Sequence, residues 1–258
     1  MKIFVDAGHN YSGWNTGAVG NGMREQDITF DVAAELGRIL REHGCEVMLS
    51  RPTLQTNLGT DNSSSINARW QMSNAWGADY FISIHVNAGG GTGAETLYAR
   101  ADALDFARSV QDVYSEQMRL RNRRVWQRTD LGVLRNTNCP SILLELAFID
   151  SPLTNPDVEI LRSKRPEMAA AVAKGVLDYI GRDALPIQPP AADPPSASPE
   201  PSPSTIVRYN IITELPSWAR STIEKLVQRG ALQGDGVGLD LSADMLRVFV
   251  VLDRLGAF

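Results

Sequence analysis

The sequence predicts an α/β fold, in which a single twisted, mostly parallel sheet is flanked by helices, followed by a small helical C-terminal domain. Strand-like and helix-like stretches alternate over residues 1–181, which is typical of α/β domains. The run Tyr80–Val86 is apolar throughout, as in a central parallel strand buried on both faces. A proline-rich stretch then sets the last part of the chain apart from this domain.

Apolar periodicity predicts the first elements of the sheet domain. An apolar run makes Lys2–Asp6 the first strand, and a stripe of apolar residues makes Asp27–His43 a helix that Gly44 ends. The strand Cys45–Ser50 follows this glycine. A second helix is expected over Ile66–Trp76.

The same alternation continues through the rest of this domain. Tyr80–Val86 and Glu95–Ala99 are expected to be strands, and Leu104–Leu120 is expected to be a long helix. The oily run Ser141–Ile149 is the last expected strand. A closing helix is expected over Pro166–Ile180, because proline is favoured in the first helical turn.

The domain organisation follows from composition. The segment Ile187–Ser204 is rich in proline and small polar residues and lacks the apolar periodicity of a core. We therefore expect a large domain over residues 1–181, a proline-rich linker over 182–205 and a helical module over 206–258. In this module one helix should open near Ser217 and a second near Ser242. Because so small a unit is marginally stable alone, the module is expected to form a homodimer.

Charge and composition exclude several classes of protein. A net charge of -5 argues against a nucleic-acid-binding surface, and the basic cluster Arg119–Arg124 is expected to be a solvated turn at a helix end. No stretch approaches the roughly 20 apolar residues that a membrane span needs. Cys45 and Cys139 have no spacing that indicates a disulfide framework or a thiolate zinc site.

A carboxylate stands inside the oily strand Ser141–Ile149, at Glu145. Carboxylates are almost never fully buried unless they are paired or coordinate a metal, so Glu145 needs a partner from elsewhere in the chain. Two other strand-like runs end in a metal-capable side chain, namely His9 and His85. Strand ends are where sites are built in open α/β sheets, so these side chains are candidates for one site.

His9 and His85 are natural ligands for a catalytic metal. Catalytic zinc usually takes three protein ligands from histidines and carboxylates and leaves a fourth position for water. Glu25, just before the helix Asp27–His43, is the nearby candidate for the third ligand. A lone histidine is more often structural, and this is the role expected for His43. On the residues alone, both roles stay open for His9 and for His85.

An ordered series of short motifs extends across Lys2–Ile180. It comprises Val5-Asp6-Ala7-Gly8-His9, Thr16-Gly17-Ala18-Val19-Gly20 with Glu25, Ser50-Arg51, Ser83-Ile84-His85-Val86-Asn87-Ala88 and Leu143-Leu144-Glu145-Leu146-Ala147-Phe148. This series resembles the zinc-dependent N-acetylmuramoyl-L-alanine amidases of the amidase-3 type, which are bacterial and phage peptidoglycan hydrolases. Ala7 and Asn10 stand where that family commonly has Pro and Gly, and the loop Tyr11–Gly22 is long. The sequence therefore does not predict how this loop contacts the substrate.

The resemblance implies an activity and a site. It implies one zinc ion per catalytic domain, held by His9, Glu25 and His85, with Glu145 as the catalytic acid/base. The implied reaction is hydrolysis of the amide bond between N-acetylmuramic acid and the L-alanine of the stem peptide. The metal would activate the attacking water and polarise the carbonyl.

Three further residues are candidates for contact with the substrate. Arg51, Asn87 and Arg135 are expected to meet its peptide carboxylates or sugar amides, because arginine recognises carboxylates through two hydrogen bonds. The alternative for these residues is a structural salt bridge or cap. A buried ion pair with Arg51 or Arg135 is likewise the structural alternative for Glu145. Glu95 could lie near the site, but no role is assigned to it.

The C-terminal stretch from Trp218 to Val248 resembles, more distantly, the small helical wall-anchoring units of phage lysins. This resemblance implies binding to a cell-wall glycopolymer of a Gram-positive host, and a dimerisation module without a ligand is the alternative. The expected partners are therefore peptidoglycan and a wall glycopolymer, with no nucleic acid and no membrane.

We interpret the chain as a phage endolysin. We expect no signal peptide, because the first residues lead directly into the predicted strand Lys2–Asp6, and this fits an enzyme that stays in the host cytoplasm until lysis and then acts at the wall. A bacterial autolysin or sporulation amidase would use the same chemistry, and a non-catalytic wall-binding protein is another alternative. A glycosidase using Asp6 and Asp27 is a rival enzyme class. Serine chemistry is disfavoured because the sequence has no G-x-S-x-G motif.

Overall fold

The computed structural model describes residues 1–182 and, beyond them, residues 208–209, 215, 217–229, 231–232, 239 and 241–242. It divides the chain into two compact units, Met1–Pro190 and Ala191–Phe258. The expected linker, from residue 183 onward, and the expected helix beyond Ser242 lie outside the described residues.

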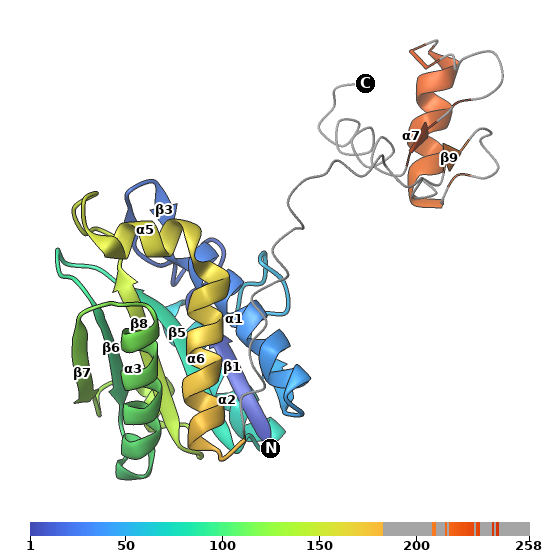
Figure 1. The fold of residues 1–258 in the computed structure, drawn as a ribbon. Coiled ribbons are helices and arrows are strands. Elements are labelled where there is room, and N and C mark those ends of the chain that lie inside the picture. The colour runs from blue at the N-terminus through green and yellow to red at the C-terminus, as the bar shows by residue number, and fades with distance from the viewer. Residues whose placement is uncertain are drawn as a thin grey trace. The chain divides into compact units, whose positions relative to one another are not determined.

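A six-stranded sheet forms the centre of the first unit (Figure 1). In spatial order its strands are β4 (Glu46–Leu49), β1 (Lys2–Ala7), β5 (Tyr80–Asn87), β8 (Ser141–Phe148), β6 (Ala94–Tyr98) and β7 (Asn122–Gln127). The first four run parallel to one another, whereas β6 pairs antiparallel with β8 and parallel with β7. The predicted mostly parallel sheet is confirmed. A short antiparallel pair, β2 (Val19–Gly20) and β3 (Met23–Arg24), lies outside it.

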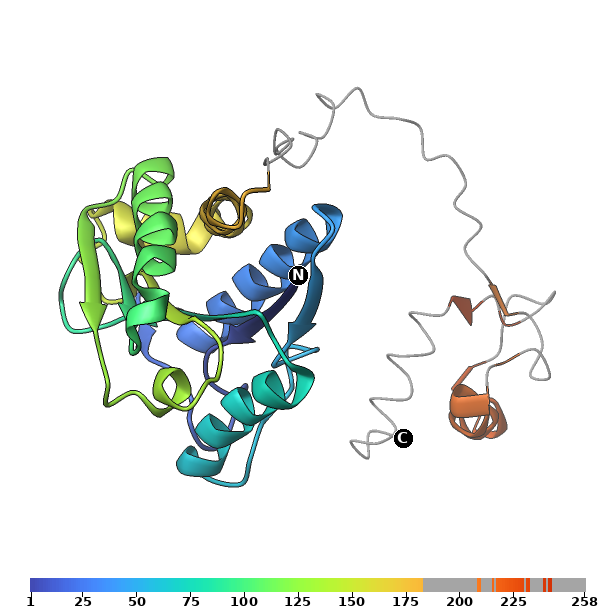
Figure 2. The same cartoon turned by 90° about the horizontal axis from the view of Figure 1, so that it is seen from below.

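Helices cover both faces of the sheet (Figure 2). One face carries α1 (Glu25–Glu42), α3 (Leu104–Gln117) and α6 (Arg165–Tyr179), and the other carries α2 (Asn62–Trp76) and α4 (Gly132–Arg135). The short helices η1 (Ala101–Ala103) and α5 (Pro156–Ser163) precede α3 and α6. These layers bury two separate apolar cores, as an α/β sheet requires.

The alternation of side chains along each strand decides which core a residue joins. In β1, Ile3 and Val5 pack into the larger core under α1, α3 and α6, whereas Phe4 packs into the smaller core under α2 and α4. In β8, Leu143 belongs to the smaller core. Glu145, two residues further along, projects from the same face beyond that core. The open end of this face is therefore the place for a site.

Some element boundaries differ from the predictions. Helix α2 begins at Asn62, earlier than predicted, because Asp61 and Ser64 form a reciprocal capping box. The cluster Arg119–Arg124 was predicted to be a solvated turn, but only its first residues form one. Arg119 adopts a left-handed φ of 52° after α3, and the residues from Asn122 onward form the edge strand β7. Strand β7 was missed because its residues are mostly polar and give little apolar alternation.

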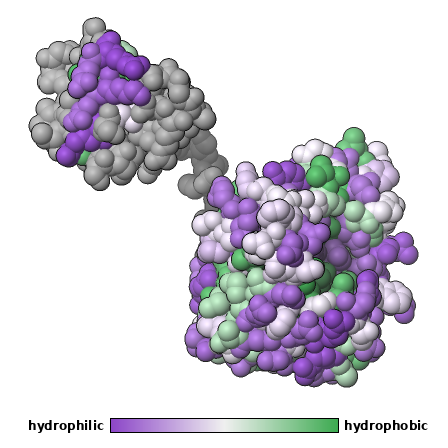
Figure 3. All heavy atoms as spheres, turned by 180° about the vertical axis from the view of Figure 1, so that it is seen from behind, coloured by the Kyte–Doolittle hydropathy of each residue, from purple (hydrophilic) through white to green (hydrophobic). Residues whose placement is uncertain are grey.

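Hydrophilic side chains cover most of the face drawn in Figure 3, and apolar atoms reach the surface in patches between them. No helix in the described part of the chain is long and apolar enough to cross a membrane.

The second unit contains the helix α7 (Ser217–Gln228) and the paired short strands β9 (Arg208–Tyr209) and β10 (Leu241–Ser242). The helix predicted to open near Ser217 is therefore confirmed. A small apolar core holds its described residues together: Leu215, Ile223, Leu226 and Leu241 are buried in it.

Candidate active site

Three side chains converge where β1 and β5 end and α1 begins. The ligand atoms of His9, Glu25 and His85 all lie within 4.8 Å of one another. Oε1 of Glu25 is 3.1 Å from Nε2 of His9 and 3.1 Å from Nδ1 of His85. Among the described residues, this is the group of histidine, cysteine and acidic side chains placed to hold one metal ion. The structure thus brings together the three ligands expected from the sequence.

Local backbone geometry aims the two histidines. Gly8 donates its N–H to the carbonyl of Ile84 (3.0 Å), and a Cβ on Gly8 would lie only 2.6 Å from the His85 ring. His9 takes a left-handed φ of 64°, which is uncommon outside glycine and costs conformational energy. Its Nδ1 lies 3.3 Å from the carbonyl of Asn15. A proton on Nδ1 would satisfy that carbonyl and leave Nε2 free for a metal.

The Glu25 carboxylate is held from both sides. Its Oε2 accepts a hydrogen bond from the Ala18 N–H (2.8 Å), and its Oε1 accepts one from the Val86 N–H (2.9 Å). Gly17 permits this approach, because a Cβ there would lie 2.7 Å from the Glu25 side chain. Burial would raise the pKa of Glu25, but hydrogen bonds from His85 and His9 outweigh it and lower the pKa far below its usual range. Glu25 is therefore a fixed carboxylate.

The donor set fits a catalytic zinc ion. Burial lowers the pKa of His85, so its imidazole stays neutral around neutral pH, and metal binding requires neutral histidine and ionised carboxylate. Two imidazoles and one carboxylate are a common protein ligand set of catalytic zinc. With Nδ1 of His9 facing a carbonyl and both Glu25 oxygens held by backbone N–H groups, the ligands are also oriented by their neighbours.

Glu145 lies beside this cluster on the neighbouring strand. It pairs in register with His85 on β5 and with Glu95 on β6. Its Oε2 is buried and has no hydrogen-bond partner. Burial, reinforced by the negative charges of Glu25 and Glu95, raises the pKa of Glu145 to about 8, whereas Arg128 lowers it. This carboxyl group can therefore take up and release a proton near neutral pH.

The structural alternative for Glu145 is not formed. Arg51 is fully buried, but its guanidinium donates to the carbonyls of Gly8 (3.3 Å), Gln26 (3.0 Å) and Leu54 (2.6 Å). Arg135 is exposed and donates to the carbonyl of Thr129 (3.2 Å). Neither arginine pairs with Glu145. For Arg51, this placement favours the structural role that the sequence left open over contact with a substrate.

Asn87 and Glu95 form the outer edge of the site. The side-chain amide of Asn87 donates to Oε1 of Glu95 (2.8 Å), and Nε of Arg123 donates to Oε2 of the same carboxylate (2.9 Å). Asn87 is half-buried at the end of β5, where it remains a candidate for substrate contact. The sequence could not assign Glu95, because its position beside Glu145 depends on strand register.

A buried ion pair supports the loop that carries His9. Nη1 of Arg69 donates to Oδ1 of Asp6 (2.6 Å), and Nη2 donates to the carbonyl of His9 (2.7 Å). Burial would raise the pKa of Asp6, but the charge of Arg69 and hydrogen bonds from Ser50 and Ser83 outweigh it and lower the pKa. Asp6 is thus a permanent buried anion, which does not suit a glycosidase acid. Sequence reasoning missed Arg69, since helix α2 has no strong apolar stripe that would mark its buried side.

Comparison with known proteins gives consistent matches. Residues 3–178 match the family model described as N-acetylmuramoyl-L-alanine amidase. The N-acetylmuramoyl-L-alanine amidase CwlM of Bacillus licheniformis is 35% identical over 191 residues, which cover 70% of this chain and 68% of that protein. The endolysin of Bacillus phage SPP1 is 31% identical over 190 residues, covering 69% of this chain and 65% of that protein. The catalytic domain of CwlV, an N-acetylmuramoyl-L-alanine amidase from Bacillus (Paenibacillus) polymyxa var. colistinus, superposes with a TM-score of 0.62 at 25% identity, covering 70% of this chain and 98% of that one.

Proposed function

Since the chain belongs to the N-acetylmuramoyl-L-alanine amidase family, we propose that it hydrolyses the amide bond between N-acetylmuramic acid and L-alanine with Glu145 as acid/base and a zinc ion on His9, Glu25 and His85. When bound there, zinc would polarise the scissile carbonyl and lower the pKa of water at its open position. The family membership makes the protein a hydrolase of peptidoglycan. The site residues and the metal are the parts that we propose.

Glu145 moves the proton in this mechanism. It takes a proton from the water that attacks the carbonyl carbon, and it then delivers that proton to the amide nitrogen as the C–N bond breaks. The second transfer is essential because an unprotonated amine is a poor leaving group. Burial raises the pKa of Glu145 in the metal-free protein, and the charge of a bound zinc ion would lower it again. These opposing effects would let the same carboxyl group first accept the proton and then donate it.

The other residues of the site position the reacting groups. Ala18 and Val86 fix the Glu25 carboxylate through their N–H groups. Arg69 holds the carbonyl of His9, so the loop keeps its left-handed turn. This support keeps ligands within the narrow geometry that catalysis needs.

One observation supports this assignment most directly. Oε2 of Glu145 is a buried polar atom without a partner, and it belongs to the residue that pairs in register with His85. A buried carboxylate that is left unpaired costs free energy, which is expected where a substrate or water completes its surroundings.

Digestion of purified cell walls tests the proposal. The walls are incubated with the protein alone, with a chelator, and with a chelator followed by excess zinc, and the released chain ends are identified. New L-alanine amino termini that disappear with the chelator and return with zinc are expected. New reducing sugar ends, or unchanged release of L-alanine termini in the chelator, would contradict the proposal.

We further propose that the enzyme acts as an endolysin, with residues 206–258 as a module that binds a cell-wall glycopolymer. The similarity to a phage endolysin and the separate compact unit at the C-terminus support this. A bacterial autolysin or sporulation amidase of the same chemistry is the alternative, because a sporulation-specific amidase of Bacillus subtilis is 37% identical over 155 residues.

A sedimentation experiment tests whether residues 206–258 bind the cell wall or serve only for dimerisation. The full chain should sediment with purified walls more completely than a chain that ends after Arg182. Removal of the glycopolymer from the walls should abolish the difference. Equal sedimentation of both chains on intact walls would contradict wall binding, and analytical ultracentrifugation of both chains would show whether residues 206–258 form a homodimer.

A further inference from the structure

A groove bordered by several arginines runs along the edge strand β7, next to the proposed active site. It has a volume of about 620 Å³, and four arginines and a single carboxylate, Glu95, line it together with Trp126. Such a concentration of positive charge contrasts with the net charge of -5 on the whole chain. The groove therefore favours an anionic occupant.

A β-bulge directs the arginines into the groove. Between β6 and β7 the register shifts from Ala94↔Asn122 to Thr96↔Val125, so that β7 carries one more residue than its partner. Arg124, within the bulge, has a left-handed φ of 74°. Bulges re-aim side chains and are frequent beside active sites.

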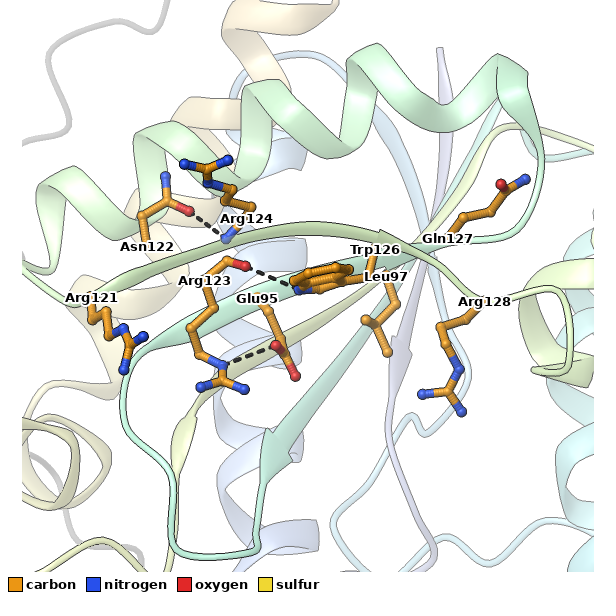
Figure 4. Close-up of a pocket in the computed structure, with 9 residues that line it drawn as sticks. All are labelled: Glu95, Leu97, Arg121, Asn122, Arg123, Arg124, Trp126, Gln127 and Arg128. Atoms are coloured by element: carbon orange, nitrogen blue, oxygen red, sulfur yellow. Dashed lines mark hydrogen bonds and ion pairs between the residues drawn. The ribbon is translucent and has the colours of Figure 1, made fainter.

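Figure 4 shows the result of this bulge. Arg121, Arg123 and Arg128 point to the same side of β7 as Glu95, whereas Arg124 points to the other side. The hollow on that other side is lined by Arg108 of α3 together with Arg124. The two faces of this strand therefore present arginines to two separate surfaces.

The arginines of the groove differ in their partners. Arg123 donates to Glu95 and stacks over the Phe148 ring at 4.9 Å, so it is held in place. Arg128 pairs with Asp130 at the surface. The side chain of Arg121 has no hydrogen bond or ion pair within the described part of the chain. The groove thus contains at least one guanidinium that is free to bind a ligand.

The groove is continuous with the proposed acid/base. Glu95, which lines it, is the register partner of Glu145. Arg128, at its other end, is close enough to act on the charge of Glu145. A substrate whose scissile bond lies at Glu145 can therefore extend over β6 into this groove.

Charge decides which part of the substrate fits. The amide to be cleaved joins a sugar chain to a stem peptide, and the free carboxylates belong to the peptide side. Arginine forks bind carboxylates through paired, charge-assisted hydrogen bonds. Trp126 is 54% exposed and is fixed by a hydrogen bond from its Nε1 to the carbonyl of Arg123 (3.0 Å), so it offers a rigid apolar wall to a peptide.

We propose that the groove along β7 binds the carboxylates of the stem peptide, on the leaving-group side of the scissile amide, through Arg121, Arg123 and Arg128. This inference rests on the proposed amidase function and adds the part of the substrate that the enzyme selects. The arginines would also keep this exposed edge strand from pairing with other chains, and that protective role alone is the explanation against which the proposal is tested.

The test uses two soluble substrates that differ only in charge. One is N-acetylmuramic acid bearing a stem peptide with free carboxylates, and the other is the same compound with these carboxylates converted to amides. The ratio of kcat/KM for the two is measured for the wild-type chain, for Arg121→Gln and for Arg121→Gln/Arg128→Gln. Because the chemistry at Glu145 is common to both substrates, the ratio isolates recognition of the carboxylates.

The wild-type chain should prefer the free carboxylates, and Arg121→Gln should reduce that preference about tenfold, mainly through KM. The matched control is Arg108→Gln, which removes the same charge from the opposite side of β7 and should leave the ratio unchanged. Equal rates for the two substrates in the wild-type chain, or an unchanged preference in the double variant, would overturn the groove proposal while the amidase function stands. If the wild-type chain cleaves neither substrate, the proposed function fails and the groove proposal fails with it.

Discussion

His85 and Glu145 occupy the same register position on the neighbouring parallel strands β5 and β8. In-register residues of adjacent strands place their side chains on the same face of the sheet, a few ångströms apart. The pairing of two central strands therefore sets the proposed acid/base beside a proposed metal ligand. Because this register is fixed by the buried apolar residues on both strands, the relationship does not depend on a flexible loop.

Glu145→Gln should abolish proton transfer while leaving the metal ligands in place. Glutamine has nearly the same shape but cannot exchange a proton, so kcat is expected to fall by about 10²–10⁴-fold. Turnover of a soluble muramyl peptide measures the loss, and the zinc content of the purified variant provides the control. A variant with full zinc content and near-wild-type turnover would contradict the assigned role.

The same residue should make the stability of the metal-free protein depend on pH. The pKa of Glu145 rises from its ordinary value of 4.5 to about 8 on folding, mainly through burial. Between these two values the folded state keeps a proton that the unfolded state has released, so stability falls as pH rises from about 4.5 to about 8. Below pH 4.5 Glu145 is protonated in both states, so the free energy of unfolding is not reduced by its ionisation.

Urea unfolding in the presence of a chelator measures this effect. At pH 5 the wild-type chain and Glu145→Gln should have similar free energies of unfolding. By pH 8.5 the glutamine variant should be the more stable of the two, since it carries no charge that burial would penalise. A difference that stays constant from pH 5 to pH 8.5 would show that the Glu145 carboxyl has no raised pKa.

Gly8→Ala should weaken metal binding. A Cβ at this position would lie 2.6 Å from two ring atoms of His85 and from the carbonyl of Ile84, so the imidazole would have to move. A displacement of one ligand should reduce zinc affinity roughly 10–100-fold, as disturbance of ligand orientation does in other zinc sites. Competition with a chromogenic chelator measures the affinity.

Gly132→Ala is the matched control for that experiment. A Cβ on Gly132 would meet no atom closer than 3.8 Å, so the same change at the start of α4 should leave zinc affinity unaltered. If both variants bind zinc as tightly as the wild-type chain, the close approach of Gly8 to His85 has no role in the site.

The sequence predicted the central strands of this fold well because their apolar runs are long and continuous. Residues Tyr80–Val86 and Ser141–Ile149 were placed almost as the structure has them, since burial on both faces leaves a strong signal. The edge strand β7 was missed, because an exposed strand has fewer apolar positions. Helix α5 was also missed, although Asn155 as its cap and Pro156 in its first turn were signals that could have revealed it.

The candidate ligands could be named from sequence, but their supporting contacts could not. His9, His85 and Glu145 stand out because polar side chains interrupt or follow apolar runs. The roles of Arg69 and Glu95 depend on partners distant in sequence, namely Asp6 and Glu145. Only the packed fold brings these partners close together in space. The sequence also does not reveal the left-handed backbone conformation of His9, because positive φ angles are not specific to histidine.

Arg51→Met should distinguish the two roles that the sequence left open for this arginine. The fully buried guanidinium is the donor to the carbonyls of Gly8, Gln26 and Leu54, and methionine would fill the space without supplying any donor. The hydroxyl of Thr29 also donates to the carbonyls of Gly8 and Gln26, so the carbonyl of Leu54 is the acceptor that would lose its partner. A buried acceptor left without a partner costs about 1–3 kcal/mol, and the free energy of unfolding should fall by about that amount. The KM for a soluble substrate should hardly change if the residue is structural. Arg135→Met is the comparison, because Arg135 is exposed and should lose little stability. A stable Arg51→Met chain with a strongly raised KM would instead establish contact between Arg51 and the substrate.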